Sequence, residues 1–293
     1  RDVTGVQTCA LPIFEIGWET WTESNGKDDI AIGNLSEAGW NGGTAVGYFA
    51  RSHGLRGAAF GASAHAYGNQ SAAIGSNAAA EGHHGVAVGF FAEAIGNNST
   101  AVGGSADETG SKGTQALGDD SSAFGAGALA AGVNSTASGA SSAAEGEGSA
   151  AYGWKALAAG VKSTASGASS AAKGEGSAAY GAGSIAHNTG SIAIGQNAVS
   201  GCESGEAERP HPDYEVDDPD AMIVTCKVDV HNTTAIGAGA KATHSFSTAL
   251  GANANASGYS STALGESAKA SGFYSTATGV SSCASGYRST AIG

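Results

Sequence analysis

Small and bulky side chains recur along this chain with a period of fourteen residues. The motif Ala-x-Gly occurs at seventeen positions that share this period, with two longer spacings of 22 and 42 residues. Self-similarity at a fixed short period is typical of solenoid proteins, in which each repeat packs only on its neighbours. The pattern therefore predicts a stack of similar units. The alanines of the motif are Ala31, Ala45, Ala59, Ala73, Ala87, Ala101, Ala123, Ala137, Ala151, Ala165, Ala179, Ala193, Ala235, Ala249, Ala263, Ala277 and Ala291.

Each repeat is expected to contain two short strands and two turns. A second glycine usually follows the first by seven residues, as in Gly61 and Gly68, and glycine supplies the backbone freedom that a turn needs. Residues 71–75 alternate in character, which is the period of a strand. A helix would carry a glycine in every second turn, at a cost of roughly 1 kcal/mol each. We therefore predict an all-β solenoid of 14-residue coils.

The residue after the motif alanine forms an apolar stripe. It is Ile, Val, Leu or Phe in twelve of the seventeen motifs. Successive side chains of a strand point to opposite faces, so the alanine and the stripe lie on opposite sides, and the sequence does not say which side is interior. A roll that is two strands thick cannot bury both, which predicts oligomerisation along the stack. The candidate core or subunit-contact residues are Ile32, Val46, Ile74, Val88, Val102, Ile194, Ile236, Leu250 and Leu264.

Several motifs resemble the head repeats of trimeric autotransporter adhesins of the YadA-like kind. They are Asn98-Ser-Thr-Ala-Val-Gly103, Ser191-Ile-Ala-Ile-Gly195 and Ser261-Thr-Ala-Leu-Gly265, and the resemblance covers about residues 31–200 and 234–293. It implies a left-handed parallel β-roll in which three chains pack side by side. It also implies a homotrimer on the surface of a Gram-negative-type bacterium. Because neck, stalk and membrane-anchor motifs are absent, attachment to the outer membrane would depend on a C-terminal anchor missing from this sequence.

The resemblance also suggests residues that contact a ligand. In that family a repeated Asn-Ser-x-Ala-Ile-Gly motif contributes to binding matrix proteins such as collagen. The nearest matches here are residues 98–103, 191–195 and 233–237, in which Thr often replaces a bulkier residue. The ligand-binding candidates are Asn98, Ser99, Thr100, Ser191, Ile192, Thr233 and Thr234.

The rest of the chain is organised around these repeats. Residues 1–13 resemble the translation of a sequencing adapter and are excluded from fold reasoning, while residues 14–30 are expected to form an irregular first coil or cap. Repeats over 31–200 include an insertion near 107–118, interpreted as a looped-out turn or an extra half coil. The repeats over 234–293 stop within the pattern, which suggests C-terminal truncation.

Residues 201–233 interrupt the repeats. They hold three of the four prolines and nine acidic residues. Because the gap equals three periods, two interpretations remain open, namely two degenerate coils within the stack or a loop that leaves and rejoins it. We favour a protruding loop, since proline cannot donate to a strand ladder. Cys202 and Cys226 bracket the insertion and could close it with a disulfide in an oxidising exterior.

Charge and composition argue against several classes of function. A net charge of −13 disfavours binding to a nucleic-acid backbone, and no apolar run is long enough to span a membrane. The eight histidines have no triad-like spacing, the acidic cluster does not follow an EF-hand order, and the cysteines lack zinc-site spacing. We therefore expect no catalytic site, no metal and no cofactor.

The sequence favours a non-enzymatic adhesin head that binds an extracellular matrix protein or another host or abiotic surface. A phage tail fibre or structural spacer built on the same trimeric roll is the main alternative. A lesser alternative is an ice-binding solenoid, which requires a regular array of threonines. Threonine precedes the motif in some coils only, for example at Thr100, Thr136, Thr164, Thr248, Thr262, Thr276 and Thr290.

Overall fold

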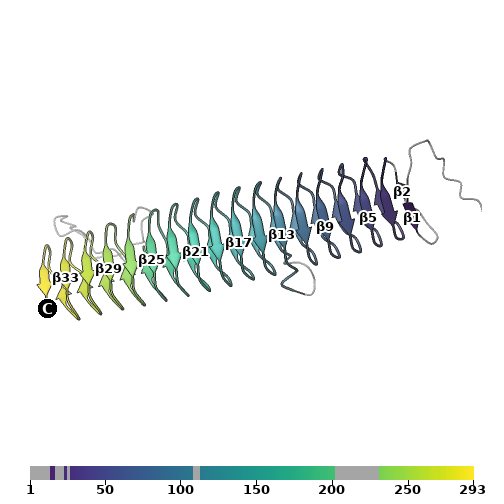
Figure 1. Ribbon diagram of the computed structural model, residues 1–293. Helices are drawn as coiled ribbons and strands as arrows, with labels where there is room; N and C mark the ends of the chain where they lie inside the picture. The colour runs from purple at the N-terminus through teal and green to yellow at the C-terminus, as the bar shows by residue number, and fades with distance from the viewer. Residues whose placement is uncertain (1–13, 17–22, 25–26, 108–112, 202–230) are drawn as a thin grey trace, which may run out of the picture. The chain divides into compact units, whose positions relative to one another are not determined.

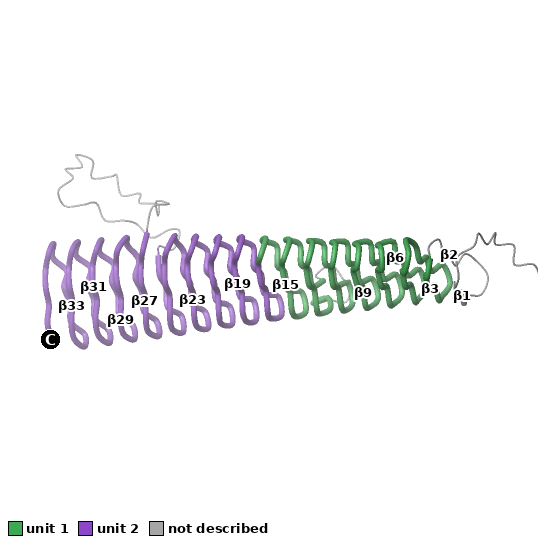
Figure 2. Tube along the Cα trace, turned by 45° about the horizontal axis from the view of Figure 1, so that its top comes forward, with its two compact units in different colours: residues 1–134 green, residues 135–293 purple. Residues whose placement is uncertain are grey.

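The computed structural model describes residues 14–16, 23–24, 27–107, 113–201 and 231–293. All regular elements in these ranges are β-strands, and none is a helix. The chain divides into two units, residues 1–134 and 135–293 (Figure 2). In each unit a strand of three residues alternates with a strand of two residues, so that one coil contains one of each.

The first unit contains strands β1 to β16. Its three-residue strands are β1 (Phe14–Ile16), β3 (Ile30–Ile32), β5 (Thr44–Val46), β7 (Ala58–Phe60), β9 (Ala72–Ile74), β11 (Val86–Val88), β13 (Thr100–Val102) and β15 (Ser122–Phe124). Its two-residue strands are β2 (Glu23–Ser24), β4 (Glu37–Ala38), β6 (Arg51–Ser52), β8 (His65–Ala66), β10 (Ala79–Ala80), β12 (Glu93–Ala94), β14 (Gln115–Ala116) and β16 (Leu129–Ala130).

The second unit contains strands β17 to β35. Its three-residue strands are β17 (Thr136–Ser138), β19 (Ala150–Tyr152), β21 (Thr164–Ser166), β23 (Ala178–Tyr180), β25 (Ile192–Ile194), β27 (Thr234–Ile236), β29 (Thr248–Leu250), β31 (Thr262–Leu264), β33 (Thr276–Thr278) and β35 (Thr290–Ile292). Its two-residue strands are β18 (Ala143–Ala144), β20 (Leu157–Ala158), β22 (Ala171–Ala172), β24 (Ile185–Ala186), β26 (Val199–Ser200), β28 (Lys241–Ala242), β30 (Asn255–Ala256), β32 (Lys269–Ala270) and β34 (Cys283–Ala284).

Within each unit, corresponding strands of successive coils pair in parallel and in register (Figure 1). Strand β7 pairs with β9 so that Ala59 lies beside Ala73 and Phe60 beside Ile74. Strand β8 pairs with β10 in the same way. The odd-numbered strands therefore form one ladder and the even-numbered strands a second. This arrangement confirms the predicted all-β, parallel solenoid of 14-residue coils.

The interior of each coil is filled by very small side chains. In the coil that starts at Ser71, the buried side chains are those of Ser71, Ala73, Ala78 and Ala80, whereas Ile74 points outward. Every buried apolar side chain in the described chain is an alanine. Among all fully buried side chains, the largest are the polar ones of Thr114, Thr233 and Asp29. The motif alanine therefore faces inward, into a narrow interior that alanine and serine fill in most coils.

Glycine makes the turn after each three-residue strand. Gly61 has a φ of 136°, a region that residues with a Cβ rarely adopt. A Cβ added there would lie 2.5 Å from the carbonyl oxygen of Gly75 in the next coil. Stacked glycines thus allow successive backbones to approach closely at this turn.

Both interruptions leave the strand ladders continuous. Strand β13 pairs with β15 and β12 with β14, across the first longer spacing. Gln115 and Ala116 belong to the regular strand β14, so the extra residues lie between Val102 and Gln115. The Thr114 hydroxyl closes this region through bonds to the carbonyl oxygens of Gly104 (3.0 Å) and Gly125 (2.7 Å).

The second interruption lies between β26 and β27. Strand β25 pairs directly with β27, and β26 with β28, so the coils on either side are neighbours in the stack. The Ser200 hydroxyl donates to the Thr233 carbonyl oxygen across this junction at 2.8 Å. Residues 202–230 of the predicted loop over 201–233 lie outside the described residues, as do residues 1–13 and the predicted disulfide between Cys202 and Cys226.

Candidate functional site

The predicted apolar stripe forms an outward column along the three-residue strands. We call it the outer column: it consists of the residue after each motif alanine. Parallel pairing brings its members into register, as for Ile74 between Phe60 and Val88. Ile74, Val102, Ile194, Leu250 and Leu264 are exposed. The remaining predicted members, Ile32, Val46, Val88 and Ile236, are half-buried.

The outer column also contains aromatic residues that were not among the nine candidate contact residues. Phe60, Phe124, Tyr152 and Tyr180 lie at the same repeat position and are exposed. Each of them directly follows a motif alanine, and this position alone is enough to predict that it belongs to the outer column. Contiguous exposed apolar surface marks an interaction site, so the outer column is the first candidate site of this molecule.

The candidate ligand-binding residues divide into buried and surface positions. Ser99, Ser191 and Thr233 are fully buried, with the Ser191 and Thr233 hydroxyl groups 2.9 Å apart inside the coil. These three side chains alternate to the same face as the motif alanine and are out of reach of a surface ligand. Strand alternation thus corrects their assignment as contact residues.

The other four candidates lie on the surface: Asn98 and Ile192 are exposed, and Thr100 and Thr234 are half-buried. Thr100, Ile192 and Thr234 precede the motif alanine and lie on the same strand face as the outer column. Asn98 lies instead in the turn before its strand.

Asn98 belongs to a set of polar turn residues that link successive coils, which we call the polar turn ladder. Its Nδ2 donates to Asp120 Oδ1 (3.0 Å), and its Oδ1 lies 3.1 Å from His84 Nδ1. At the turn position one residue before Asn98 and its equivalents, the backbone N–H group donates to the side chain at the same position of the next coil. These bonds are Leu55 N to Asn69 Oδ1 (3.0 Å), His83 N to Asn97 Oδ1 (3.1 Å) and Asn97 N to Asp119 Oδ1 (2.7 Å).

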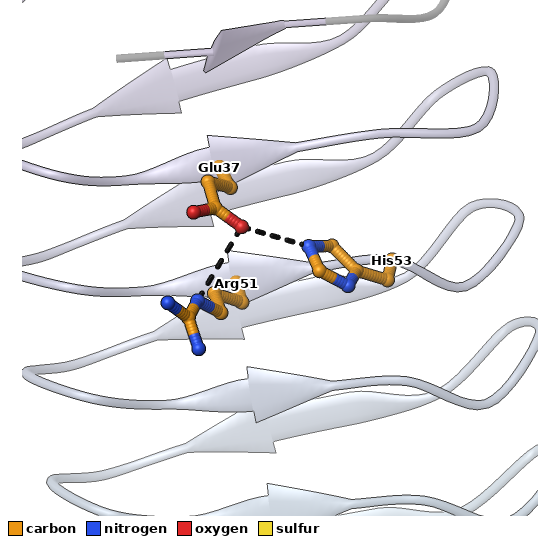
Figure 3. Close-up of polar contacts among 3 residues, drawn as sticks. All are labelled: Glu37, Arg51 and His53. Atoms are coloured by element: carbon orange, nitrogen blue, oxygen red, sulfur yellow. Dashed lines mark hydrogen bonds and ion pairs between the residues drawn. The ribbon is translucent and has the colours of Figure 1, made fainter. Parts of the chain in front are cut away.

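A cluster of charged side chains lies on the two-residue strands near the start of the first unit (Figure 3). Glu37 Oε2 lies 3.4 Å from Arg51 Nε and 3.0 Å from His53 Nε2. Glu37 comes from β4, Arg51 from β6, and His53 follows β6 directly, so parallel pairing of β4 with β6 positions all three. The three side chains are substantially exposed, which limits the stabilisation that such ion pairs provide.

The cluster continues into the next coil through His65 and Tyr67. The Tyr67 ring contacts the His53 ring (5.4 Å between centroids) and the His65 ring (5.3 Å). Burial lowers the pKa of His65, and the charges of Arg51 and His53 lower it further, against opposing effects of Glu81 and Glu37. The ion pairs and ring contacts of the cluster thus link side chains of successive coils at the surface.

Metal-binding and membrane-spanning features were also sought in the described residues. No group of three His, Cys, Asp or Glu side chains within them could hold a metal ion. The described part of the chain likewise has no helix with the length and apolarity to cross a membrane. Cys283, on the outward face of β34, is a free and exposed thiol.

Comparison with known proteins agrees with this geometry. The family model of the YadA head domain repeat (two copies) matches residues 24–50, 52–78, 80–106, 130–156, 231–254, 256–282 and 270–293. No curated protein matches the chain significantly. The matched segments cover more than half of the sequence and coincide with the stacked coils of both units. The chain therefore belongs to the YadA head domain repeat family.

Proposed function

We propose that this protein is the head of a trimeric, non-enzymatic adhesin displayed on a bacterial surface. Membership of the YadA head family supports an adhesin-type head. The observation that carries the trimer is the outer column, whose apolar side chains remain exposed in a single chain.

The composition of the coil interior explains why an assembly is needed. An alanine side chain buries little apolar area, and the hydrophobic contribution scales with that area at about 25 cal/mol per Å². The bulky side chains of the described coils, by contrast, lie on the outside. Packing the outer columns of three chains together would bury them and supply the stabilisation that each coil interior lacks.

Adhesion is the activity that best fits such a surface. Repeated coils present the same outward positions many times, which lets a large ligand make many weak contacts at once. Attachment to the outer membrane through an anchor would place this surface outside the cell. Extracellular matrix proteins and other host or abiotic surfaces are the proposed partners.

The proposal is tested in two measurements. Sedimentation of the purified chain is expected to give about three times the monomer mass of 28.2 kDa. Bacteria that display the chain on an outer-membrane anchor are expected to adhere to matrix-coated or abiotic surfaces better than bacteria with the anchor alone. A stable monomer would contradict the trimer. A trimer that promotes no adhesion to any surface would instead identify a structural spacer, such as part of a tail fibre.

A further inference from the structure

Aromatic side chains gather in one turn of four successive coils in the second unit. The turn follows each of the two-residue strands β28, β30, β32 and β34. We call the group the aromatic turn ladder, and it consists of Phe246, Tyr259, Phe273, Tyr274 and Tyr287.

The rings contact one another from coil to coil. Ring centroids are 5.8 Å apart for Phe246 and Tyr259, 6.3 Å for Tyr259 and Phe273, and 6.1 Å for Tyr274 and Tyr287. The Tyr259 and Phe273 rings are nearly parallel, at 25°. Phe246, Tyr274 and Tyr287 are 50%, 43% and 41% exposed, so the ladder presents rings to its surroundings.

Turn formation does not account for these aromatic residues. In the first unit the same repeat position holds Asn69, Asn97 and Asp119, which accept backbone N–H bonds, and also the apolar residues Leu55 and Val133. The carbon atoms of an aromatic ring cannot accept such a bond. A row of partly exposed rings at this turn therefore replaces a bonding arrangement that the coils with Asn69, Asn97 and Asp119 retain, which indicates a role in binding.

Positive charge accompanies the rings. Residues 231–293 contain Lys241, Lys269 and Arg288 against the single carboxylate Glu266, whereas the whole chain has a net charge of −13. The Arg288 guanidinium lies 5.0 Å from the Tyr287 ring centre and 5.9 Å from that of Tyr274. Lys241 and Lys269 are exposed on strands β28 and β32, which lead directly into the aromatic turns.

The geometry points to a binding site for a linear anionic glycan along the aromatic turn ladder. The C–H bonds on a pyranose face carry partial positive charge, which the negative face of an aromatic ring attracts. Coils repeat about every 4.8 Å, a spacing close to the length of one sugar unit, so successive sugars can meet successive rings. Arg288, Lys241 and Lys269 would pair with the carboxylate or sulfate groups of the glycan. The inference rests on the proposed adhesin function and names a ligand class for it.

The ladder is better suited to a ligand than to a second copy of this chain. Subunit contact through the outer column recurs in coil after coil of both units. The aromatic residues of the ladder occupy four successive coils, and the matching positions of the described first unit carry no Phe, Tyr or Trp. A contact between parallel copies would be expected to continue along the stack.

The experiment titrates the assembled protein with a hyaluronan octasaccharide, a neutral maltooctaose and poly-glutamate, each by calorimetry. The test variant is Tyr259→Asn/Phe273→Asn/Tyr287→Asn, which installs the residue found at positions 69 and 97. The control variant, Tyr48→Ala/Phe49→Ser, removes two aromatic residues from the opposite turn and installs those found at positions 62 and 63. A charge variant, Lys269→Asn/Arg288→Asn, tests the cations.

The wild-type protein is expected to bind hyaluronan roughly tenfold more tightly than maltooctaose, with poly-glutamate weaker than hyaluronan. The triple Asn variant and the charge variant should each weaken hyaluronan binding by about tenfold, with an unchanged sedimentation mass, while the control variant binds as the wild type does. The inference is overturned if the wild-type protein does not bind hyaluronan, or if it binds poly-glutamate equally well. It is also overturned if the triple Asn variant or the charge variant binds hyaluronan as tightly as the wild type, or if the control variant binds it more weakly. A reduced mass of the triple variant also overturns it, because the rings would then be a subunit contact.

Failure of the inference can be separated from failure of the proposed function. If displayed wild-type protein promotes adhesion and the triple Asn variant promotes it equally, without glycan binding, the adhesin stands and the glycan site does not. If the wild-type protein promotes no adhesion at all, the proposed function itself fails.

Discussion

Glycine at the turn after each three-residue strand is required by backbone geometry. Gly61 combines a φ of 136° with a neighbouring carbonyl oxygen where a Cβ would be. The same turn contains Ser63 at a φ of 54°, in the left-handed region that polar residues tolerate far better. The chain thus places glycine where a Cβ would collide with the next coil, and residues of several sizes, Ser63, Phe49 and Phe91 among them, where the left-handed conformation costs less.

Substitution of Gly61 by alanine tests this requirement. The backbone conformation alone should cost roughly 1–3 kcal/mol of unfolding free energy, and the contact with the Gly75 carbonyl adds to it. Chemical denaturation measures the loss. The control is Gly176→Asn, because a Cβ there meets nothing within 4 Å and Asn134 occupies the same repeat position at a φ of 56°. Equal stability of the Gly61→Ala and wild-type proteins would contradict the close approach of successive coils.

The inward alanine is the second constraint at the residue scale. Ala73→Val would add two methyl groups to a space lined by alanine and serine, and overpacking of this kind typically costs about 1–3 kcal/mol. Ala72→Val is the matched control, since residue 72 points outward and the next coil has Val86 at that position. A thermal melt should show a lower Tm for Ala73→Val only. Similar melting of both variants would mean that the interior tolerates larger side chains.

At the scale of the element, each strand is too short to be stable by itself. A strand of two or three residues gains its hydrogen bonds from the coils on either side, as Gly75 N–H does from the Phe60 carbonyl at 2.8 Å. The parallel pairing of strands in successive coils then determines which side chains become neighbours. Glu37 meets Arg51 and His53 in this way, although it lies one coil earlier in the sequence.

This cluster predicts a pH-dependent contribution to stability. The pKa of His65 is lowered from its ordinary value of 6.5 by burial and by Arg51 and His53. The folded state therefore favours the neutral imidazole, so this contribution is fully present above pH 6.5 and is lost as the pH falls through the folded-state pKa. His65→Gln, which matches Gln115 at the same position, should reduce the fall in Tm between pH 7.5 and pH 5. An identical pH profile for the variant would show that His65 does not contribute.

For the whole molecule, the outer column decides whether single chains can exist alone. Ile74→Asp together with Val88→Asp would place two carboxylates in the proposed subunit contact, where an unpaired buried charge is very costly. Sedimentation should show dissociation or unfolding of this variant. Ala79→Glu is the control, because its outward position on a two-residue strand carries glutamate in other coils, as at Glu93. If the double variant sediments like the wild type, the subunits do not meet along the outer column.

The sequence analysis reached the repeat architecture because its determinants are local. The fixed spacing of Ala73, Gly75 and their equivalents follows from one strand and one turn, and these need only neighbouring residues. The same spacing puts Phe60 and Tyr152 at the position of the stripe, and it also places Tyr259, Phe273 and Tyr287 in one row. That row was not predicted, because most other coils carry no aromatic residue at this position, and the ring contacts of the structure reveal it.

The sequence by itself therefore determined the period, the strands, the turns and the family resemblance. Only the tertiary structure decided which strand face is interior. Alternation along a strand separates two faces but does not say which one is inside, and the short distance between the two strand ladders decides this by leaving room mainly for alanine and serine. As a result Ser99, Ser191 and Thr233 are buried inside the coils, and Ile74 is exposed. The tertiary structure also decided that β25 meets β27 across the long interruption, since strand pairing depends on stacking in space and not on separation along the chain.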